Sequence, residues 1–131
     1  MYLRREELTE MDVRVLIVDD SMTGRKMMKR ALPAALAGDV TEAGSGEEAL
    51  RICTTQSVDL MFLDLTMPGM TGFDVLEALQ KETSPPVVIV VSGDVQTPAQ
   101  ERVKELGAFA FIHKPATAPV IEEALKRTRF L

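Results

Sequence analysis

The sequence predicts an α/β fold in which one parallel sheet is covered by helices on both faces. Short apolar runs of the kind typical of buried strands alternate with helical patterns along the chain. Alternation of this kind implies parallel strands joined by right-handed crossover helices. We expect five strands and five helices in one domain over residues 13–131, after a short charged extension over residues 1–12.

The first elements follow from apolar spacing and from helix caps. The first strand is expected over residues 13–18, the second over 39–43 and the third over 59–63. The first helix carries apolar residues at helical spacing on one face, namely Met28, Ala31, Leu32 and Ala35. Pro33 should kink or end that helix. Ser45-Gly46-Glu47-Glu48 reads as a capping box that opens the second helix.

In the second half of the domain, proline and glycine residues mark the expected turns and the ends of helices and strands. Further elements are expected as follows: a turn at Pro68-Gly69, a helix capped by Thr71, a strand after Pro85-Pro86, a strand over residues 108–112, and a last helix from near Pro119. Thr97-Pro98 resembles a cap followed by a first-turn proline, and Gly107 is placed to end that helix. Met27, Met28 and Met61 are expected to fill the core.

Composition excludes several classes of protein. The chain has 131 residues, 46% of them hydrophobic, and a net charge of −5, which does not favour direct contact with nucleic acid. Its single cysteine, Cys53, cannot form an internal disulfide and is expected to be a buried thiol. The N-terminal residues lack the apolar stretch of a signal peptide, and no apolar run is long enough for membrane insertion. We therefore expect a cytoplasmic protein.

Polar residues follow four of the predicted strands. Asp19-Asp20, Asp64, Ser92 and Lys114 each stand where an apolar run ends. In an open α/β sheet, ligands bind at the carboxyl ends of the strands, so these side chains should converge. Carboxylate oxygens suit a hard divalent cation, Mg²⁺ or Mn²⁺, and an ammonium group can hold a phosphoryl group. Asp64, alone after the most apolar strand, is the candidate nucleophile for an acyl phosphate.

Each of these residues also has a plainer interpretation. Asp19-Asp20 can form a turn and a helix cap, and Asp64 can cap the next segment. Ser92 can begin a loop, and a lysine after a strand is usually exposed. Pro115 argues against the last interpretation, because a cis Lys114-Pro115 bond would fix the direction of the lysine. His113 should point away from Lys114, which favours a surface role.

The motifs, taken together, resemble one family. Asp19-Asp20, the run from Asp64 through Thr66 and Pro68 to Gly72, Ser92-Gly93, and Phe111-Ile112-His113-Lys114-Pro115 occur in the order seen in the response-regulator receiver domain, of the CheY-like chemotaxis type. The resemblance covers about residues 13–131. It implies a flavodoxin-like fold with strand order 2-1-3-4-5. It also implies transient phosphorylation of one aspartate by a sensor histidine kinase or a small phosphodonor.

The resemblance also assigns roles by position. Asp64 resembles the phosphoacceptor, with Asp19, Asp20 and the backbone carbonyl of Thr66 as further ligands of the metal. Lys114 resembles the lysine that binds the phosphoryl group. Ser92 and Phe111 resemble the hydroxyl and aromatic members of the switch, although Phe111 lacks the hydroxyl that many relatives carry as tyrosine. Thr66 and Asp94 occupy the variable positions that tune loss of the phosphoryl group.

The implied activity is signalling by protein–protein contact, without turnover of a substrate. Expected partners are the kinase, a downstream protein target and a phosphatase, and the chain is expected to be a monomer or a phosphorylation-dependent dimer. Three alternatives remain. A flavodoxin-type electron carrier conflicts with Asp19-Asp20, which would repel a flavin phosphate. A hydrolase of the haloacid-dehalogenase type would need a carboxylate where Thr66 stands. A degenerate receiver would act only as a scaffold.

Overall fold

A five-stranded parallel sheet forms the centre of the fold. In the computed structural model, residues 13–93 and 96–131 are described. The strands are β1 (Val15–Val18), β2 (Val40–Ala43), β3 (Leu60–Leu63), β4 (Val87–Ser92) and β5 (Ala110–His113). Their order is β2-β1-β3-β4-β5, which confirms the predicted order 2-1-3-4-5. The extension over residues 1–12 and the residue Asp94 lie outside the described residues.

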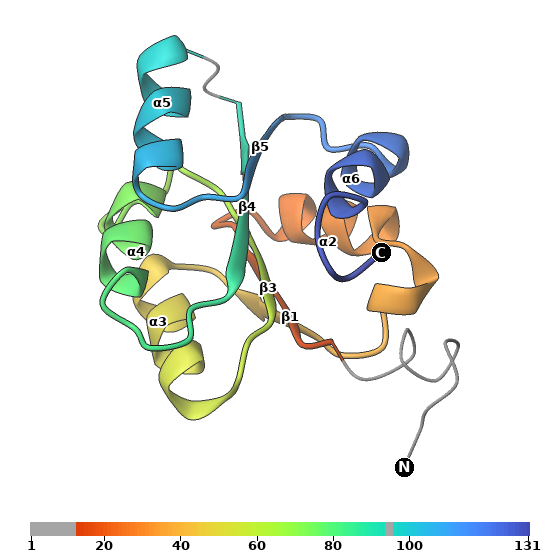
Figure 1. Ribbon diagram of the computed structural model, residues 1–131, viewed down its shortest axis with the longest axis horizontal. Coiled ribbons are helices and arrows are strands. Elements are labelled where there is room, and N and C mark those ends of the chain that lie inside the picture. The colour runs from red at the N-terminus through yellow and green to blue at the C-terminus, as the bar shows by residue number, and fades with distance from the viewer. Residues whose placement is uncertain (1–12, 94–95) are drawn as a thin grey trace.

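Helices cover both faces of this sheet, as predicted. Within the described ranges the α-helices are α2 (Met22–Ala31), α3 (Gly46–Thr55), α4 (Gly72–Leu79), α5 (Thr97–Glu105) and α6 (Ala118–Leu125). Figure 1 shows α2 and α6 on one face and α3, α4 and α5 on the other. None of the helices described is long and apolar enough to cross a lipid bilayer.

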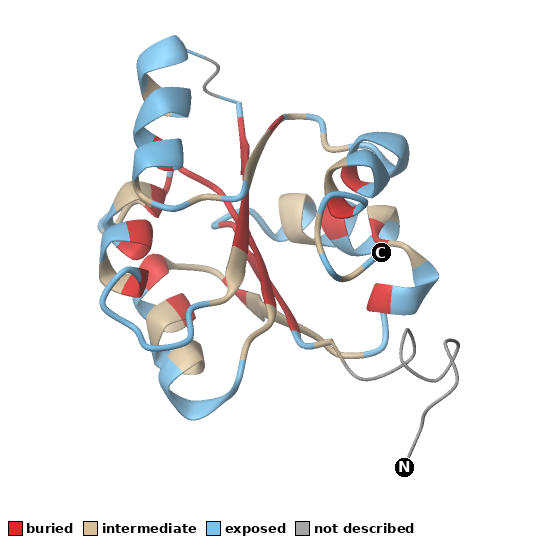
Figure 2. Ribbon diagram, viewed as in Figure 1, coloured by how far each residue is buried: buried red, intermediate tan, exposed pale blue. Residues whose placement is uncertain are grey.

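The core consists of two apolar layers, one on each side of the sheet. Leu16 and Val18 of β1 belong to the layer under α3, α4 and α5, whereas Val15 and Ile17 belong to the layer under α2 and α6. All four residues are buried, because alternate side chains enter opposite layers and both layers are covered. Figure 2 shows this burial running along the central strands.

Side-chain caps begin three of the helices. Ser21, Ser45 and Thr71 each accept a hydrogen bond from a backbone N–H in the first helical turn. Thr71 is part of a complete capping box with Asp74. The predicted box at Ser45 is only half formed, because the carboxylate of Glu48 accepts from Gly44 N at 3.3 Å.

Several local expectations were wrong. Thr97 is the first residue of α5 rather than its cap, which is Gln96. After Pro33 the chain forms a 3₁₀ turn, η1 (Ala34–Leu36), and its tighter winding buries Leu36 and exposes Ala35. Met27 is 55% exposed rather than part of the core. Gly107 ends α5 as predicted, with a positive φ of 97°.

The strand register sets where the carboxyl ends meet. Val18 of β1 lies opposite Leu63 of β3, and Ser92 of β4 lies opposite His113 of β5. The residues that follow β1 and β3 are therefore neighbours at one edge of the sheet, and Lys114 enters the same edge from β5.

Candidate functional site

Three carboxylates meet at the carboxyl edge of the sheet. Asp19 and Asp20 follow β1, and Asp64 follows β3, so the parallel register places them side by side. Each offers an oxygen atom, and these three atoms lie within 4.8 Å of one another. Asp19 and Asp64 are buried and Asp20 is exposed. The predicted convergence of these residues is present in the structure.

The electrostatics of this cluster favour a bound cation. Burial raises the pKa of the Asp64 carboxyl, the nearby Lys114 opposes that increase, and the charges of Asp19 and Asp20 add to it. The carboxylate is thus less stable in its ionised form than it would be in water. An oxygen-only donor set with this repulsion fits a hard divalent cation such as Mg²⁺.

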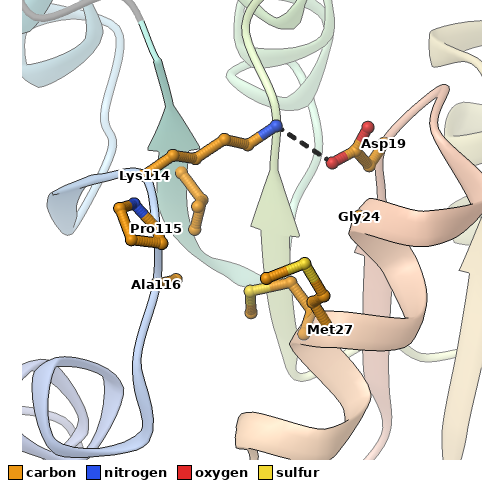
Figure 3. Close-up of a pocket in the computed structure, with 8 residues that line it drawn as sticks. Asp19, Gly24, Met27, Lys114, Pro115 and Ala116 are labelled. Atoms are coloured by element: carbon orange, nitrogen blue, oxygen red, sulfur yellow. Dashed lines mark hydrogen bonds and ion pairs between the residues drawn. The ribbon is translucent and has the colours of Figure 1, made fainter.

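Lys114 reaches from the end of β5 into this cluster. Its Nζ atom lies 3.1 Å from Asp19 Oδ2 and 3.7 Å from Asp64 Oδ1. Figure 3 shows the extended side chain pointing to Asp19 across the edge of the sheet. The backbone N–H of Lys114 donates to the carbonyl of Ser92 at 2.9 Å, which extends the β4–β5 pairing by one residue. The Lys114-Pro115 bond is cis, and His113 is exposed.

The loop after β3 wraps around Asp64. Thr66 N donates to Asp64 Oδ1 at 3.4 Å, and Gly72 N donates to the carbonyl of Leu65 at 3.1 Å. A Cβ atom on Gly72 would lie 2.5 Å from the carbonyl oxygen of Asp64, so only glycine allows α4 to begin this close to the strand. Gly72 is the last residue of the motif that begins at Asp64, but the sequence alone gave no reason to expect this role for it.

Ser92 and Phe111 lie on the same face of the sheet. Val90 and Phe111 are opposite one another in the β4–β5 register and belong to the same apolar layer. Ser92 is two residues beyond Val90, so its side chain enters that layer too. Ser92 is fully buried, whereas Phe111 is only partly buried. The two side chains therefore face the same apolar layer, one from each of two neighbouring strands.

An apolar cavity of about 340 Å³ opens beside the charged cluster. Met27 of α2 lies on one side of it and Pro115 on the other (Figure 3), and Met28 also lines it. Asp19 and Lys114 line its polar end. Met27, although largely exposed, therefore lines the same cavity as Asp19 and Lys114.

Sequence reasoning missed two residues of α2 that contact Asp19. A Cβ atom on Gly24 would lie 2.5 Å from Asp19 Oδ2. Arg25 donates from Nη1 to the Asp19 carbonyl at 2.7 Å. Both follow the acidic pair by about one helical turn, and that spacing is the signal by which they could have been found.

Chemically, the site combines one nucleophilic oxygen, further oxygen donors and one ammonium group. Such a set can hold a phosphoryl group between a cation and Lys114 while the Asp64 carboxylate attacks phosphorus. A second carboxylate two residues beyond Asp64, which a hydrolase of the alternative class would use, is absent because Thr66 stands there.

Comparisons with known proteins agree with this geometry. The family model for the response regulator receiver domain matches residues 15–126. The chain is 34% identical over 114 residues to "Probable transcriptional regulator ycf27" of Cyanidium caldarium, covering 86% of this chain and 44% of that protein. It is 31% identical over 116 residues to "Probable chemotaxis protein CheY" of Rhizobium etli, covering 87% and 90%.

Solved structures show the same fold. The chemotaxis response regulator CheY4 of Vibrio cholerae superposes with a TM-score of 0.78 at 27% identity, covering 88% of this chain and 98% of that one. This chain spans less than half of the ycf27 relative but nearly all of the CheY relative. Because the family model covers most of the chain and the structure has the strand order and acidic cluster of the fold, this chain belongs to the response regulator receiver domain family of two-component signalling.

Proposed function

We propose that this chain is a response regulator that signals through Mg²⁺-dependent phosphorylation of Asp64. The observation that carries the proposal is the position of Lys114 Nζ, 3.1 Å from Asp19 and 3.7 Å from Asp64, beside three clustered carboxylates. Receiver domains accept phosphoryl groups from histidine kinases, and they bind Mg²⁺ at an acidic pocket of this kind. Asp19, Asp20, Asp64 and the Thr66 carbonyl would hold the metal.

The proposed reaction is a phosphoryl transfer. An Asp64 carboxylate oxygen forms a bond to phosphorus while the bond from phosphorus to the donor breaks, either to a kinase imidazole nitrogen or to the acyl oxygen of a small donor. The bond electrons leave with the donor. Water later attacks phosphorus, releases inorganic phosphate and restores the carboxylate. Bound Mg²⁺ would supply charge neutralisation at the phosphoryl oxygens, and Lys114 binds the same oxygens as a point charge.

The transferred group would then act on the switch. Phosphorylation replaces one negative charge with roughly two and adds strong acceptor oxygens. Ser92 moves toward these oxygens, and the Phe111 ring fills the space that it leaves. A near-complete shift requires about 5.5 kcal/mol of differential stabilisation, whereas one hydrogen bond to a charged group supplies about 1.5–3 kcal/mol. Ser92 therefore shares the task with Lys114, the metal and the loop amides.

Intact-mass measurement tests the phosphoacceptor. The chain is incubated with acetyl phosphate and Mg²⁺, and again with EDTA in place of Mg²⁺. We expect the mass of one phosphoryl group on the wild type only when Mg²⁺ is present, and none on Asp64→Asn. Asp74→Asn is a matched control, because Asp74 is an exposed carboxylate in the cap of α4 and should not affect the gain. Phosphorylation of Asp64→Asn at the wild-type level would refute the proposal.

Hydrogen exchange tests the switch. We expect phosphorylation to change exchange in peptides over residues 109–124, which include Phe111 and the start of α6. Ser92→Ala should still gain the phosphoryl mass but show a much smaller change in these peptides. A Ser92→Ala chain with the wild-type exchange response, or with undiminished binding of its target when phosphorylated, would contradict the role of Ser92.

The proposed partners follow from the same activity. A sensor histidine kinase supplies the phosphoryl group, a downstream protein reads the switched face, and a phosphatase can remove the group. The R. etli relative is named as a chemotaxis protein and the C. caldarium relative as a transcriptional regulator, so relatives of similar sequence carry different outputs. The net charge of −5 favours a protein target over direct contact with nucleic acid.

A further inference from the structure

Arg25 connects three elements next to the candidate site. It lies in α2, its Nη1 donates to the backbone carbonyl of Asp19 at 2.7 Å, and its Nε donates to Glu42 Oε1 of β2 at 3.0 Å. Its side chain is only 16% exposed. A guanidinium group can make both contacts at once because its donors are arranged in a rigid fork.

The contact to Asp19 fixes the start of the acidic turn. The Asp19 carbonyl belongs to the planar peptide that joins Asp19 to Asp20, so its direction also sets the orientation of the Asp20 backbone. Asp19 N donates to the carbonyl of Ala43 at 3.1 Å, and Asp19 Oδ1 accepts from Ser21 N at 2.9 Å. Arg25 donates to the carbonyl oxygen and Lys114 donates to Oδ2. The backbone N–H, the carbonyl and both carboxylate oxygens of Asp19 therefore each have a hydrogen-bond partner.

Glu42 in turn fixes the guanidinium group. Glu42 lies opposite Ile17 in the β1–β2 register, and its second oxygen accepts from Lys29 Nζ at 3.3 Å. Burial tends to raise the pKa of Glu42, but the hydrogen bonds from Arg25 and Lys29 outweigh that effect and lower it. The two basic side chains therefore favour the carboxylate form of Glu42, whose Oε1 accepts from Arg25.

We propose that Arg25, held by Glu42, is a positioning residue that orients the Asp19–Asp20 turn for divalent-cation binding. This inference rests on the proposed function of the site. Arg25 contacts neither the phosphoacceptor nor the reacting atoms, and it acts through the Asp19 peptide. Residues that orient metal ligands from outside the ligand set contribute about 10- to 100-fold to metal affinity.

The direction in which Mg²⁺ affinity changes when Arg25 is removed distinguishes a positioning role from a purely electrostatic effect. Arg25 is a cation near a cation site, so by Coulomb's law alone its removal should strengthen Mg²⁺ binding. If Arg25 orients the turn, its removal should weaken Mg²⁺ binding instead. Lys29 provides the matched control, because it belongs to the same helix and contacts the same carboxylate of Glu42 but does not contact Asp19.

The test measures binding of Mg²⁺ alone to the full chain, without phosphodonor, from backbone amide shifts in NMR spectra. We expect Arg25→Ala to weaken binding about 10- to 100-fold. Arg25→Lys should also weaken it, since a single ammonium keeps the charge but cannot make both fixed contacts. Lys29→Ala should change the affinity by less than about twofold, as expected for an exposed ion pair.

A second variant covers the case in which Arg25→Ala does not fold. Glu42→Gln keeps the shape of the side chain and removes the charge that holds the guanidinium, and it should also weaken Mg²⁺ binding. The double variant Arg25→Ala/Glu42→Gln should bind no more weakly than Arg25→Ala, because Glu42 acts through Arg25. Spectra recorded before Mg²⁺ is added establish that each variant is folded.

Two results would overturn the inference. One is an affinity for Arg25→Ala or Glu42→Gln that equals or exceeds that of the wild type, and the other is full restoration by Arg25→Lys. Failure of the proposed function gives a different result, because the wild type itself would then show no saturable Mg²⁺ shift or no Mg²⁺-dependent phosphoryl gain. The two failures are therefore distinguishable.

Discussion

Lys114 and Asp19 form an ion pair of 3.1 Å between residues 95 positions apart in the sequence. The pair links the segments that follow β5 and β1 across the carboxyl ends of the strands between them. It brings an ammonium group to the carboxylates that would hold a metal. The ammonium group and the metal both lower the repulsion within the acidic cluster. They should therefore compete for it electrostatically even though both assist the proposed transfer.

This competition predicts opposite effects of Lys114→Ala on binding and on reaction. Mg²⁺ affinity should be unchanged or higher, because a nearby cation is removed. The rate of phosphoryl gain from acetyl phosphate should fall by about 10²-fold, the usual loss when one donor to a developing charge is removed. Amide shifts measure the first quantity and intact mass the second. Lys126→Ala, an exposed lysine at the end of α6, should change neither, and a wild-type reaction rate for Lys114→Ala would contradict the role assigned to it.

Gly24→Ala should weaken metal binding without lowering the stability of the fold. Alanine is favoured over glycine inside a helix by about 1 kcal/mol, so the variant should gain helix stability. Its Cβ atom would stand 2.5 Å from Asp19 Oδ2, and the carboxylate would have to move. We expect weaker Mg²⁺ binding with an unchanged or raised melting temperature. Gly38→Ala is the control, because a Cβ atom there meets nothing within 4 Å. Wild-type Mg²⁺ affinity in Gly24→Ala would show that the carboxylate accommodates the methyl group.

Much of this site could be predicted because it depends on where strands end. Asp64 and Lys114 each follow a short apolar run, and a parallel sheet brings such ends to one edge. The two covered faces and the convergence of the carboxylates follow from that pattern, whereas the strand order was implied by the resemblance to the family. Motif order added the identity of the family, which apolar spacing alone does not contain.

The contact between Arg25 and Glu42 could not be found in this way. The two residues are 17 positions apart, and their contact depends on the register of the edge strand β2 against β1, which no local pattern encodes. The expectation that Ala35 lies on the apolar face of the first helix was wrong for a related reason. The helical period was extended through Pro33, whereas the chain forms a 3₁₀ turn after that residue. Local patterns thus predicted elements and their ends, whereas contacts between elements required the fold.

Ile121→Ala should strongly destabilise the fold. Ile121 is fully buried in the layer between α6 and the sheet, and removal of a large aliphatic side chain from such a site costs about 2–5 kcal/mol. Val120 is the adjacent residue of the same helix and is 44% exposed, so Val120→Ala should change stability by less than about 0.5 kcal/mol. Urea unfolding measures both. Similar losses for the two variants would contradict the assignment of the buried face of α6.

Asp64→Asn should stabilise the metal-free protein, and the gain should depend on pH. The folded pKa of Asp64 lies above its ordinary value, so ionisation costs more in the folded than in the unfolded chain. Below the ordinary pKa both states carry a protonated Asp64, and the wild type loses nothing. As pH rises from there through the raised folded pKa, the wild type loses stability relative to Asp64→Asn, and above that range the difference is constant. The asparagine oxygen can still accept from Thr66 N, so the loop contact is retained.

Urea unfolding in EDTA across acidic to neutral pH measures this difference. The stabilisation by Asp64→Asn should be largest at neutral pH and should shrink toward acidic pH. Added Mg²⁺ should reduce it, because the cation binds the folded wild type more tightly and offsets the same repulsion. Glu123→Gln, a change at an exposed carboxylate of α6, should show no comparable gain. An Asp64→Asn chain that is less stable than the wild type at neutral pH in EDTA would mean that Lys114 stabilises the Asp64 carboxylate more than burial and its acidic neighbours destabilise it.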